Sequence, residues 1–225
     1  MISLTLKLSW QLVVFGGEKT EEKEDEFDNE ETVCTDVFML RNGTWTEMAS
    51  MQKPRVEFTA CAMPDGRVAI AGGMEELEDL EPAAFMATVE VLDIEKNEWS
   101  DLPDMAQART TPHLVAVGGT LKVLGGQGER LEWGTRGDLL VSCEQLKAGA
   151  DAWTELGDMP GMQVEFHYRD IFDRMARLVR GSIVLIARDK SSQEAKPPAL
   201  VHVYDDEAER WFSSGALMTE YGGMF

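Results

Sequence analysis

The sequence predicts an all-β fold, a β-propeller of about four blades with four antiparallel strands each. Three observations support this prediction: a tryptophan that returns at a nearly constant interval, a short apolar run that ends in two glycines, and turn signals between alternating strands. The tryptophans are Trp45, Trp99, Trp153 and Trp211, so that the first two intervals are equal and the third is slightly longer. A repeat of this length, divided by turns into four strands, has the size of one propeller blade.

Each repeat is expected to begin with a hairpin. The runs "VVFGG", "AIAGG" and "KVLGG" end at Gly17, Gly73 and Gly126, whereas the fourth equivalent, "VLIAR", ends at Arg188 without glycine. A turn precedes each run, in "MPDGR", "VGGTL" and "VRGSI", where glycine supplies the positive φ that tight hairpins need. The glycine pairs themselves predict places where neighbouring backbone leaves no room for a Cβ atom.

A third strand is predicted before each tryptophan and a fourth strand around it. The third strands are "VCTDVFML", "ATVEVLD", "LLVSCEQL" and "ALVHVYD", with Phe38, Leu92, Leu146 and Tyr204 seven positions before the tryptophans. The blades are therefore expected at about 1–50, 51–105, 106–160 and 161–220, with an acidic loop insertion at 18–32. One exception to an all-strand chain is "DIFDRMARL", whose apolar residues have partly helical spacing.

The second repeat, "RVAIAGG…ATVEVLDIEKNEWSDLPDMAQAR", resembles a kelch repeat. It has an apolar strand ending in Gly-Gly, a long loop, V-E-x-x-D, and a tryptophan six residues after the aspartate. Asp93 and Trp99 have this spacing, as do Asp205 and Trp211. The resemblance implies a kelch-type β-propeller. Because such propellers commonly have six or seven blades, four repeats imply either part of a larger propeller or an unusual small ring.

The tryptophans are expected to be structural. A tryptophan buries about 150–250 Å² and can fill the wedge between two blades that pack face to face. We favour this role over a binding role at all four positions.

Composition excludes several classes of protein. The chain has 225 residues, is 44% hydrophobic, and carries 21 basic against 41 acidic residues, a net charge of -20. No apolar run approaches the roughly 20 residues of a membrane helix, and the charge argues against nucleic-acid binding, which needs clustered Lys and Arg. If charge guides recognition, the partner is basic.

Two further features indicate a cytoplasmic protein, with a nuclear location as the alternative. Apolar residues alternate from Ile2 to Leu8, which predicts a half-buried strand, whereas a signal peptide would be continuously apolar. Cys34, Cys61 and Cys143 are few and scattered, and are interpreted as buried thiols.

Function in a repeat fold is expected where the repeats differ, in the loops. The loops between second and third strands and the connections into the next blade should share one side of the propeller, here called the loop face. Residues 18–31 hold nine acids and two lysines, and residues 74–82 hold five acids and no base. These loops are either solvated acidic insertions or a surface that attracts a basic polypeptide.

The third loop, "QGERLEWGTRGD", offers a tryptophan flanked by arginines, a composition typical of interaction hot spots; the alternative is that the tryptophan folds onto its own blade. The long connection "GMQVEFHYRDIFD" adds further aromatic and basic groups. Arginines that open the first strands of blades two and three are either structural or partner-binding. The candidate partner-binding residues are Arg55, Glu75, Glu76, Glu78, Asp79, Arg109, Arg130, Trp133, Arg136, His167, Tyr168 and Arg169.

Enzymatic and metal sites are not expected, and no cofactor is predicted. A kelch-like copper oxidase needs two Tyr, two His and a Cys cross-link, but His167 and Tyr168 are adjacent and would point to opposite faces of a strand. His202 and Tyr204 are expected in the core of a blade. The acidic loop "EDEFDNEE" lacks the register of a calcium loop, and no nucleophile or zinc motif occurs.

The pattern V-E-x-x-D…W…M…R is most similar to the propellers of BTB–kelch proteins, and F-box–kelch proteins are similar in the same residues. This resemblance implies a non-enzymatic protein-interaction module, and by extension a substrate receptor of a cullin-type ubiquitin ligase that would be joined through a domain absent from this sequence. An actin-binding or scaffold role is the alternative, and a sugar-modifying enzyme is the third.

Overall fold

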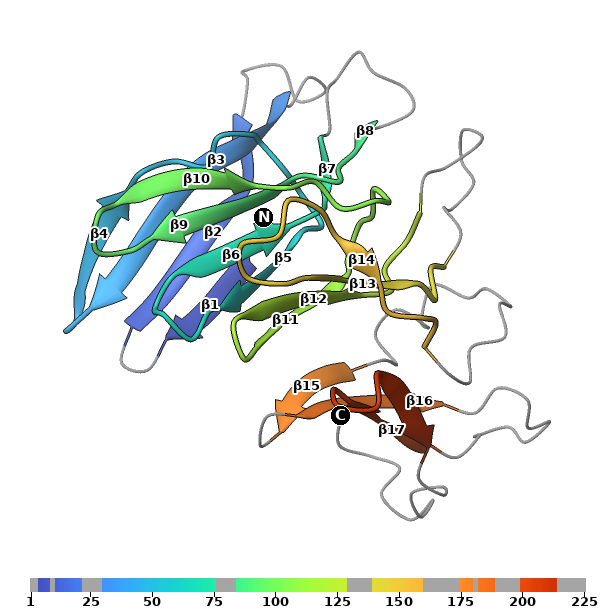
Figure 1. The fold of residues 1–225 in the computed structure, drawn as a ribbon. Coiled ribbons are helices and arrows are strands. Elements are labelled where there is room, and N and C mark those ends of the chain that lie inside the picture. The colour runs from blue at the N-terminus through green and yellow to red at the C-terminus, as the bar shows by residue number, and fades with distance from the viewer. Residues whose placement is uncertain are drawn as a thin grey trace.

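The structure, a computed structural model, describes residues 4–8, 11–21, 30–75, 84–128, 139–159, 175–179, 182–188 and 199–213. In these ranges the regular structure consists of strands, and no helix occurs (Figure 1). The all-β prediction is therefore confirmed. Within the same ranges, none of the secondary structure is a helix with the length and apolar character needed to cross a bilayer.

Four antiparallel sheets follow one another along the chain, each with four strands paired in chain order. Blade 1 has β1 (Leu4–Leu8), β2 (Gln11–Glu21), β3 (Glu30–Arg41) and β4 (Thr44–Met48). Blade 2 has β5 (Thr59–Ala62), β6 (Val68–Ala71), β9 (Val89–Asp93) and β10 (Glu98–Leu102). Blade 3 has β11 (His113–Val117), β12 (Thr120–Leu124), β13 (Cys143–Leu146) and β14 (Thr154–Glu155). Blade 4 has β15 (Met175–Val179), β16 (Ser182–Arg188), β17 (Ala199–Asp205) and β18 (Arg210–Ser213).

The four sheets fall within the residue ranges expected for the blades. A fifth, two-stranded ribbon in the loop of blade 2 was not expected. It consists of β7 (Met74–Glu75) and β8 (Ala84–Phe85), paired Met74 to Phe85 and Glu75 to Ala84. The stems of this loop are therefore ordered.

The glycine pattern has the predicted causes. The hairpin turns use Gly66 and Gly119, whose φ angles are 89° and 81°. At the end of the apolar runs the reason is steric, because a Cβ on Gly73 would lie 2.6 Å from the carbonyl oxygen of Val56. A Cβ on Gly126 would lie equally close, 2.6 Å, to the carbonyl oxygen of Thr110.

The core is divided among the interfaces between successive blades. Between blades 1 and 2 the buried residues are Val13, Phe15, Val37, Met39, Met48, Met51, Val68, Ile70 and Leu92. Between blades 2 and 3 they are Cys61, Ala69, Ala71, Val89, Val91, Met105, Leu114, Ala116, Leu121, Val123, Leu146 and Trp153. Between blades 3 and 4 they are Val115, Leu124, Cys143, Leu156, Met159, Ile183 and Tyr204. Face-to-face packing of sheets thus supplies the apolar burial.

Two tryptophans join blades in the expected way. The indole Nε1 of Trp99 donates a hydrogen bond of 2.8 Å to the carbonyl oxygen of Ala49, at the end of blade 1. The Nε1 of Trp153 donates in the same manner, at 2.7 Å, to the carbonyl oxygen of Pro103. The interval between the two tryptophans equals the interval between their acceptors, so the repeat applies to donor and acceptor alike.

For Trp45 the expectation of a buried wedge is wrong. Its side chain is 52% exposed, against 8% for Trp153 at the same repeat position. The physical reason is that Trp45 lies on the side of blade 1 away from blade 2, where no described blade covers it. Phe38, which precedes Trp45 by the same interval as buried Leu92 precedes Trp99, is also exposed, at 39%.

Two further expectations need correction. The acidic segment at 18–32 is not a plain loop, because its ends continue the blade 1 hairpin, with Glu18 paired to Val33 and Glu21 to Glu30. The partly helical spacing of "DIFDRMARL" does not give a helix over its described part, since residues 175–179 form β15 and pair with β16. Pairing with a neighbouring strand outweighs this weak helical pattern.

Candidate functional site

The loop face is built as expected, with loops and connections side by side. The backbone N–H of Gly73, at the start of the blade 2 loop, donates to the carbonyl oxygen of Arg109 at 2.9 Å. The N–H of Arg109 donates back to the carbonyl oxygen of Met86 at 3.1 Å. The N–H of Met105 donates to the carbonyl oxygen of Ala87 at 2.9 Å. The loop of blade 2 is thus attached to the connection that leads into blade 3.

Arg55 lies beneath this face with no exposed surface. Its Nη1 donates to the carbonyl oxygens of Gly72 and Thr88, at 2.9 and 3.4 Å, and its Nη2 donates to Thr88 Oγ1 at 3.1 Å. Nη2 also forms an ion pair with Glu90, which is itself buried. Burial lowers the pKa of the Arg55 guanidinium, and the charge of Glu90 opposes this shift. We call Arg55 with Glu90 the first Arg–Glu clamp.

Arg109, also with no exposed surface, repeats the same contacts one repeat later. Its Nη1 donates to the carbonyl oxygens of Gly125 and Ser142, at 2.7 and 3.1 Å, and its Nη2 donates to Ser142 Oγ at 3.3 Å. The ion pair from Nη2 to Glu144 Oε1 is 2.5 Å long. We call Arg109 with Glu144 the second Arg–Glu clamp.

These contacts decide between the two roles considered for the arginines. A partner-binding role for Arg55 and Arg109 does not fit, because both guanidinium groups are buried and already bound to groups of their own blade. Glu90 and Glu144 were not among the residues expected to have a role. The signal was present, since these glutamates and the arginines recur at the same interval as Trp99 and Trp153.

The other candidates are distributed as follows. Glu75 is described; it is half-buried in β7, at the stem of the acidic loop. Its partner-binding role stays a prediction. The remaining candidates lie outside the described residues: Glu76, Glu78, Asp79, Arg130, Trp133, Arg136, His167, Tyr168 and Arg169.

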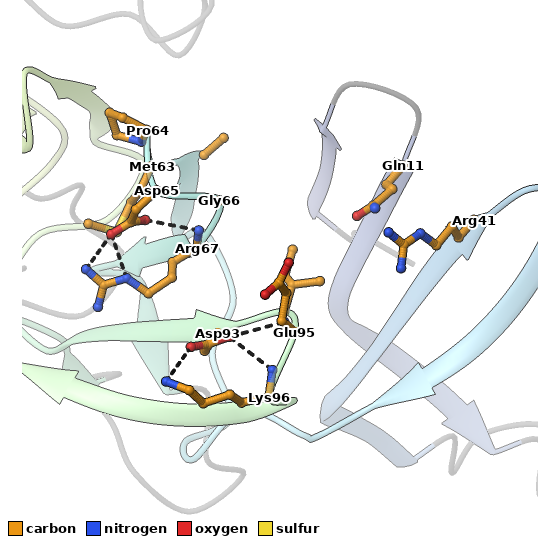
Figure 2. A pocket seen from close by; sticks show the side chains of 12 residues that line it. Gln11, Arg41, Met63, Pro64, Asp65, Gly66, Arg67, Asp93, Glu95 and Lys96 are labelled. Carbon is orange, nitrogen blue, oxygen red and sulfur yellow. Dashed lines mark hydrogen bonds and ion pairs between the residues drawn. The ribbon is translucent and has the colours of Figure 1, made fainter.

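A cleft of about 760 Å³ lies on the opposite side, where the short hairpin turns of blades 1 and 2 meet (Figure 2). Gln11 and Arg41 form one wall, and residues 62–67 and 93–96 form the other. With the Gln11 amide oriented to suit its neighbour, its oxygen accepts two hydrogen bonds of 3.1 Å from Arg41. The size is that of a ligand pocket.

The charged side chains of the two turns that line the cleft form ion pairs within those turns. Arg67 pairs with Asp65 at 2.7 Å, and this hydrogen bond lowers the pKa of the Asp65 carboxyl. Lys96 pairs with Asp93 at 3.0 Å, and the backbone N–H of Lys96 is the main cause of a lowered Asp93 pKa. Acids and bases balance among the lining residues. The cleft therefore offers no net charge to a partner, and the loop face remains the stronger candidate.

The interface between blades 3 and 4 contains buried polar groups, of which His202 and Tyr204 were expected in the core and Lys122 was not singled out from the sequence. Lys122 is buried in blade 3, pairs with Asp206 of blade 4, and lies 4.5 Å from the centre of the Tyr204 ring. His202 is 1% exposed; its Nδ1 lies 2.8 Å from Ser213 Oγ, and its Nε2 has no hydrogen-bond partner in the part of the chain that the structure describes. The core position predicted for His202 and Tyr204 is the observed one.

The cysteines and possible metal ligands add no second site in the described part of the chain. All three cysteines are free thiols. Burial raises the pKa of Cys61 and of Cys143 to about 12, which makes both poor nucleophiles near neutral pH. Among the described residues no group of three or more His, Cys, Asp or Glu side chains is placed to hold a metal ion.

Sequence comparison finds kelch proteins. Residues 54–106 match the family described as Kelch motif. The chain is 31% identical to Kelch-like protein 41b of Danio rerio over 90 residues, which are 40% of this chain and 14% of the relative. It is 31% identical to human Kelch domain-containing protein 8B over 131 residues, 56% of this chain and 35% of the relative. An F-box/kelch-repeat protein of Arabidopsis thaliana is 27% identical over 128 residues, 55% of this chain and 29% of the relative. The chain thus spans well under half of the relatives it matches.

Structural comparison agrees. The solved structure of YjhT superimposes with a TM-score of 0.64, covering 96% of this chain and 70% of that one, at 14% sequence identity. At this identity the likeness concerns the fold alone. It extends over nearly the whole chain, beyond the single repeat that matches the kelch motif.

Proposed function

We propose that this chain, which is a kelch-repeat β-propeller, is a non-enzymatic protein-interaction module that binds a polypeptide through its loop face. One observation carries the proposal. Blades 2 and 3 share their framework down to single hydrogen bonds around Arg55 and Arg109, whereas the loops that leave this framework differ in charge and in aromatic content. Variation confined to loops on a repeated scaffold is typical of a recognition surface.

The expected partner carries basic segments. The acidic residues of 18–31 belong to the loop of blade 1, and those of 74–82 belong to the loop of blade 2, the next blade along the chain. The second group begins at the hairpin stem that contains Glu75. A concentration of like charge raises the local potential and speeds association with a partner of opposite charge. Aromatic and basic residues of the third and fourth loops would add short-range specificity.

The finer form of the proposal is a substrate receptor of a ubiquitin ligase, active in the cytoplasm or the nucleus. It is supported by similarity to a kelch-like protein and to an F-box/kelch-repeat protein. In this form the propeller holds the substrate, and contact with a cullin is made by a separate domain. Co-precipitation of a cullin with the full-length gene product would test this part on its own.

The test of the main proposal removes loop charge without touching the framework. Five acids of the second loop are replaced by their amides: Glu75, Glu76, Glu78, Asp79 and Glu81. A partner is first captured with the native chain and identified by mass spectrometry, and its association rate is then measured by surface plasmon resonance at two salt concentrations. The variant should associate more slowly at low salt and show a weaker dependence on salt, because screening acts on long-range attraction.

A matched control loses the same charge elsewhere. It carries amides at five exposed acids remote from this loop: Glu47, Glu95, Glu98, Asp151 and Glu207. If both variants slow association equally, net charge alone is responsible and the loop face is not the site. If neither changes the rate, the acidic loops serve solvation and the binding surface lies elsewhere.

A further inference from the structure

Each Arg–Glu clamp closes the neck of one loop. Nη1 of Arg55 binds the carbonyl oxygens of Gly72 and Thr88, the two residues between which the loop of blade 2 leaves the sheet. Nη1 of Arg109 binds those of Gly125 and Ser142, which flank the loop of blade 3 in the same way. A single buried cation thus holds both ends of each loop.

The glutamate adds a third segment to the same point. Glu90 binds Arg55 through Oε1 and accepts a 2.9 Å hydrogen bond through Oε2 from the backbone N–H of Gln52. Glu144 binds Arg109 through Oε1 and accepts a 2.6 Å bond through Oε2 from the N–H of Ala106. Gln52 and Ala106 lie in the connections that lead into the blade. The loop and the neighbouring connection of the loop face are therefore fixed to one ion pair.

Stability alone does not require this arrangement. Two charges lose their hydration on burial, and well-packed apolar residues in their place are often as stabilising or more so. An ion pair whose hydrogen bonds are directed at loop ends and at the neighbouring connection instead restricts where these segments can lie, since a buried donor that loses its acceptor costs about 1–3 kcal/mol. The contacts are thus suited to fixing position.

We infer that the Arg55–Glu90 and Arg109–Glu144 clamps are positioning residues of the loop face, each setting the neck of its own loop and so the placement of the side chains that meet a partner. This inference rests on the proposed function for its consequence in binding. It does not depend on that function for the geometry of the necks.

Blade 4 supplies a contrast within the chain. His202 lies as far before Trp211 as Glu144 lies before Trp153, so His202 occupies the repeat position of the clamp glutamate in blade 4. A neutral imidazole cannot replace a carboxylate that accepts hydrogen bonds from an arginine and an amide at once. His202 instead contacts Ser213 of its own sheet, and no described residue is a partner of its Nε2. In blade 4, therefore, the residue at the position of the clamp glutamate does not form an ion pair that holds a loop neck.

The experiment removes one clamp at a time and measures hydrogen exchange in both loops. One variant carries Arg55→Met with Glu90→Leu, and the other carries Arg109→Met with Glu144→Leu. Removing both charges avoids an unpaired buried ion. Exchange is followed by mass spectrometry in peptides covering 73–87 and 126–141, with the interiors of the blade strands as the internal reference.

The first variant should accelerate exchange in 73–87 by about tenfold or more and leave 126–141 unchanged. The second should accelerate exchange in 126–141 by a similar factor and in 73–87 much less, because only the backbone of Arg109 contacts the blade 2 loop. If the double variants do not fold, Arg55→Lys keeps the charge but loses the planar fork, and it should loosen the same loop selectively. Unchanged loop exchange in a folded variant overturns the inference. Equal loosening of both loops, or of the strands as well, also overturns it, because the pair then stabilises the blade without positioning a loop.

The exchange readout separates this inference from the proposed function. It needs no partner, so a failure to change loop exchange leaves the binding proposal intact. Conversely, if no partner binds the loop face, selective loosening still establishes what the clamps do. Where a partner is in hand, each clamp variant should weaken its affinity while the five-acid control described above leaves the affinity unchanged.

Discussion

Replacement of Trp153 by alanine should destabilise the propeller far more than the same change at Trp45. The two residues occupy one repeat position, Trp45 within β4 and Trp153 directly before β14, so the repeat pattern does not distinguish them. Trp153 is 8% exposed and donates a hydrogen bond to Pro103, whereas Trp45 is 52% exposed. The pair therefore isolates the effect of an interface between blades.

The expected magnitude follows from burial. A tryptophan that buries roughly 200 Å² at ~25 cal/mol per Å² contributes up to about 5 kcal/mol, and truncation of large core residues costs about 3–5 kcal/mol. We expect a loss in this range for Trp153→Ala and less than about 2 kcal/mol for Trp45→Ala. Trp153→Phe keeps most of the packing and removes the indole donor, which should cost about 1–2 kcal/mol.

The assay is equilibrium urea unfolding followed by circular dichroism, because fluorescence would change with each tryptophan removed. The m-value is compared among variants, since an altered m-value would show a change in the unfolding transition as well as in stability. Equal destabilisation by Trp45→Ala and Trp153→Ala would refute the reasoning, because contact with the neighbouring blade would then not determine what the residue contributes.

Three other outcomes can be checked on the same protein. Iodoacetamide should label Cys61 and Cys143 only after unfolding, as read by peptide mass spectrometry, because burial raises the pKa of each thiol to about 12. Burial lowers the pKa of His202 below the 6.5 of a free imidazole, so the unfolded chain binds the proton more readily and stability should fall as the pH drops below about 6.5; His202→Gln should weaken this dependence in urea midpoints. Asp206→Ala removes the partner of buried Lys122 and should cost about 1 kcal/mol by thermal unfolding, the exposure of the aspartate limiting the effect.

The control for the last change is a second charged pair at the same boundary. Lys147 and Glu209 lie 3.9 Å apart and are both largely exposed. Glu209→Ala should leave the thermal midpoint nearly unchanged, since exposed pairs contribute little. An equal shift for Asp206→Ala and Glu209→Ala would show that burial of Lys122 does not strengthen its ion pair.

The repeat made much of the fold predictable. The interval between Trp99 and Trp153 located the blades, and the glycine pairs marked backbone contacts that the structure confirms at Gly73 and Gly126. The exposure of Trp45 was not predictable from its own sequence, because burial there depends on which sheet lies beside blade 1. A local pattern reports what a residue can pack against and not whether a neighbour is present.

The candidate site was less predictable than the fold. Arg55 stands at the start of a first strand, and either an exposed or a buried arginine is compatible with that position. The deciding partner, Glu90, lies far along the chain and meets it only after two strands and a loop have folded. The pairing is visible in retrospect because arginine and glutamate recur with one period. For the acidic loops, the composition predicts the net charge. It does not predict where the side chains lie.

The three interfaces between successive blades differ in polarity. At the position four residues before the second glycine, blades 1 and 2 carry Val13 and Ala69, whereas blade 3 carries Lys122, which pairs with Asp206 of blade 4. Replacing apolar contact by a charged one adds desolvation cost at this boundary.

The tryptophan contact changes at the same boundary. Trp99 and Trp153 each donate to a carbonyl oxygen of the preceding blade, while the buried Nε1 of Trp211 has no acceptor among the described residues. Blade 4 packs on blade 3 through the apolar cluster that includes Leu124 and Ile183, and through the pairs Lys122–Asp206 and Lys147–Glu209. Within blade 4, Tyr204 and Trp211 make an edge-on contact with ring centres 5.2 Å apart. Both Arg–Glu clamps lie on the blade 1 side of this boundary. The loop necks that they fix therefore belong to blades 2 and 3, whose shared interface is apolar.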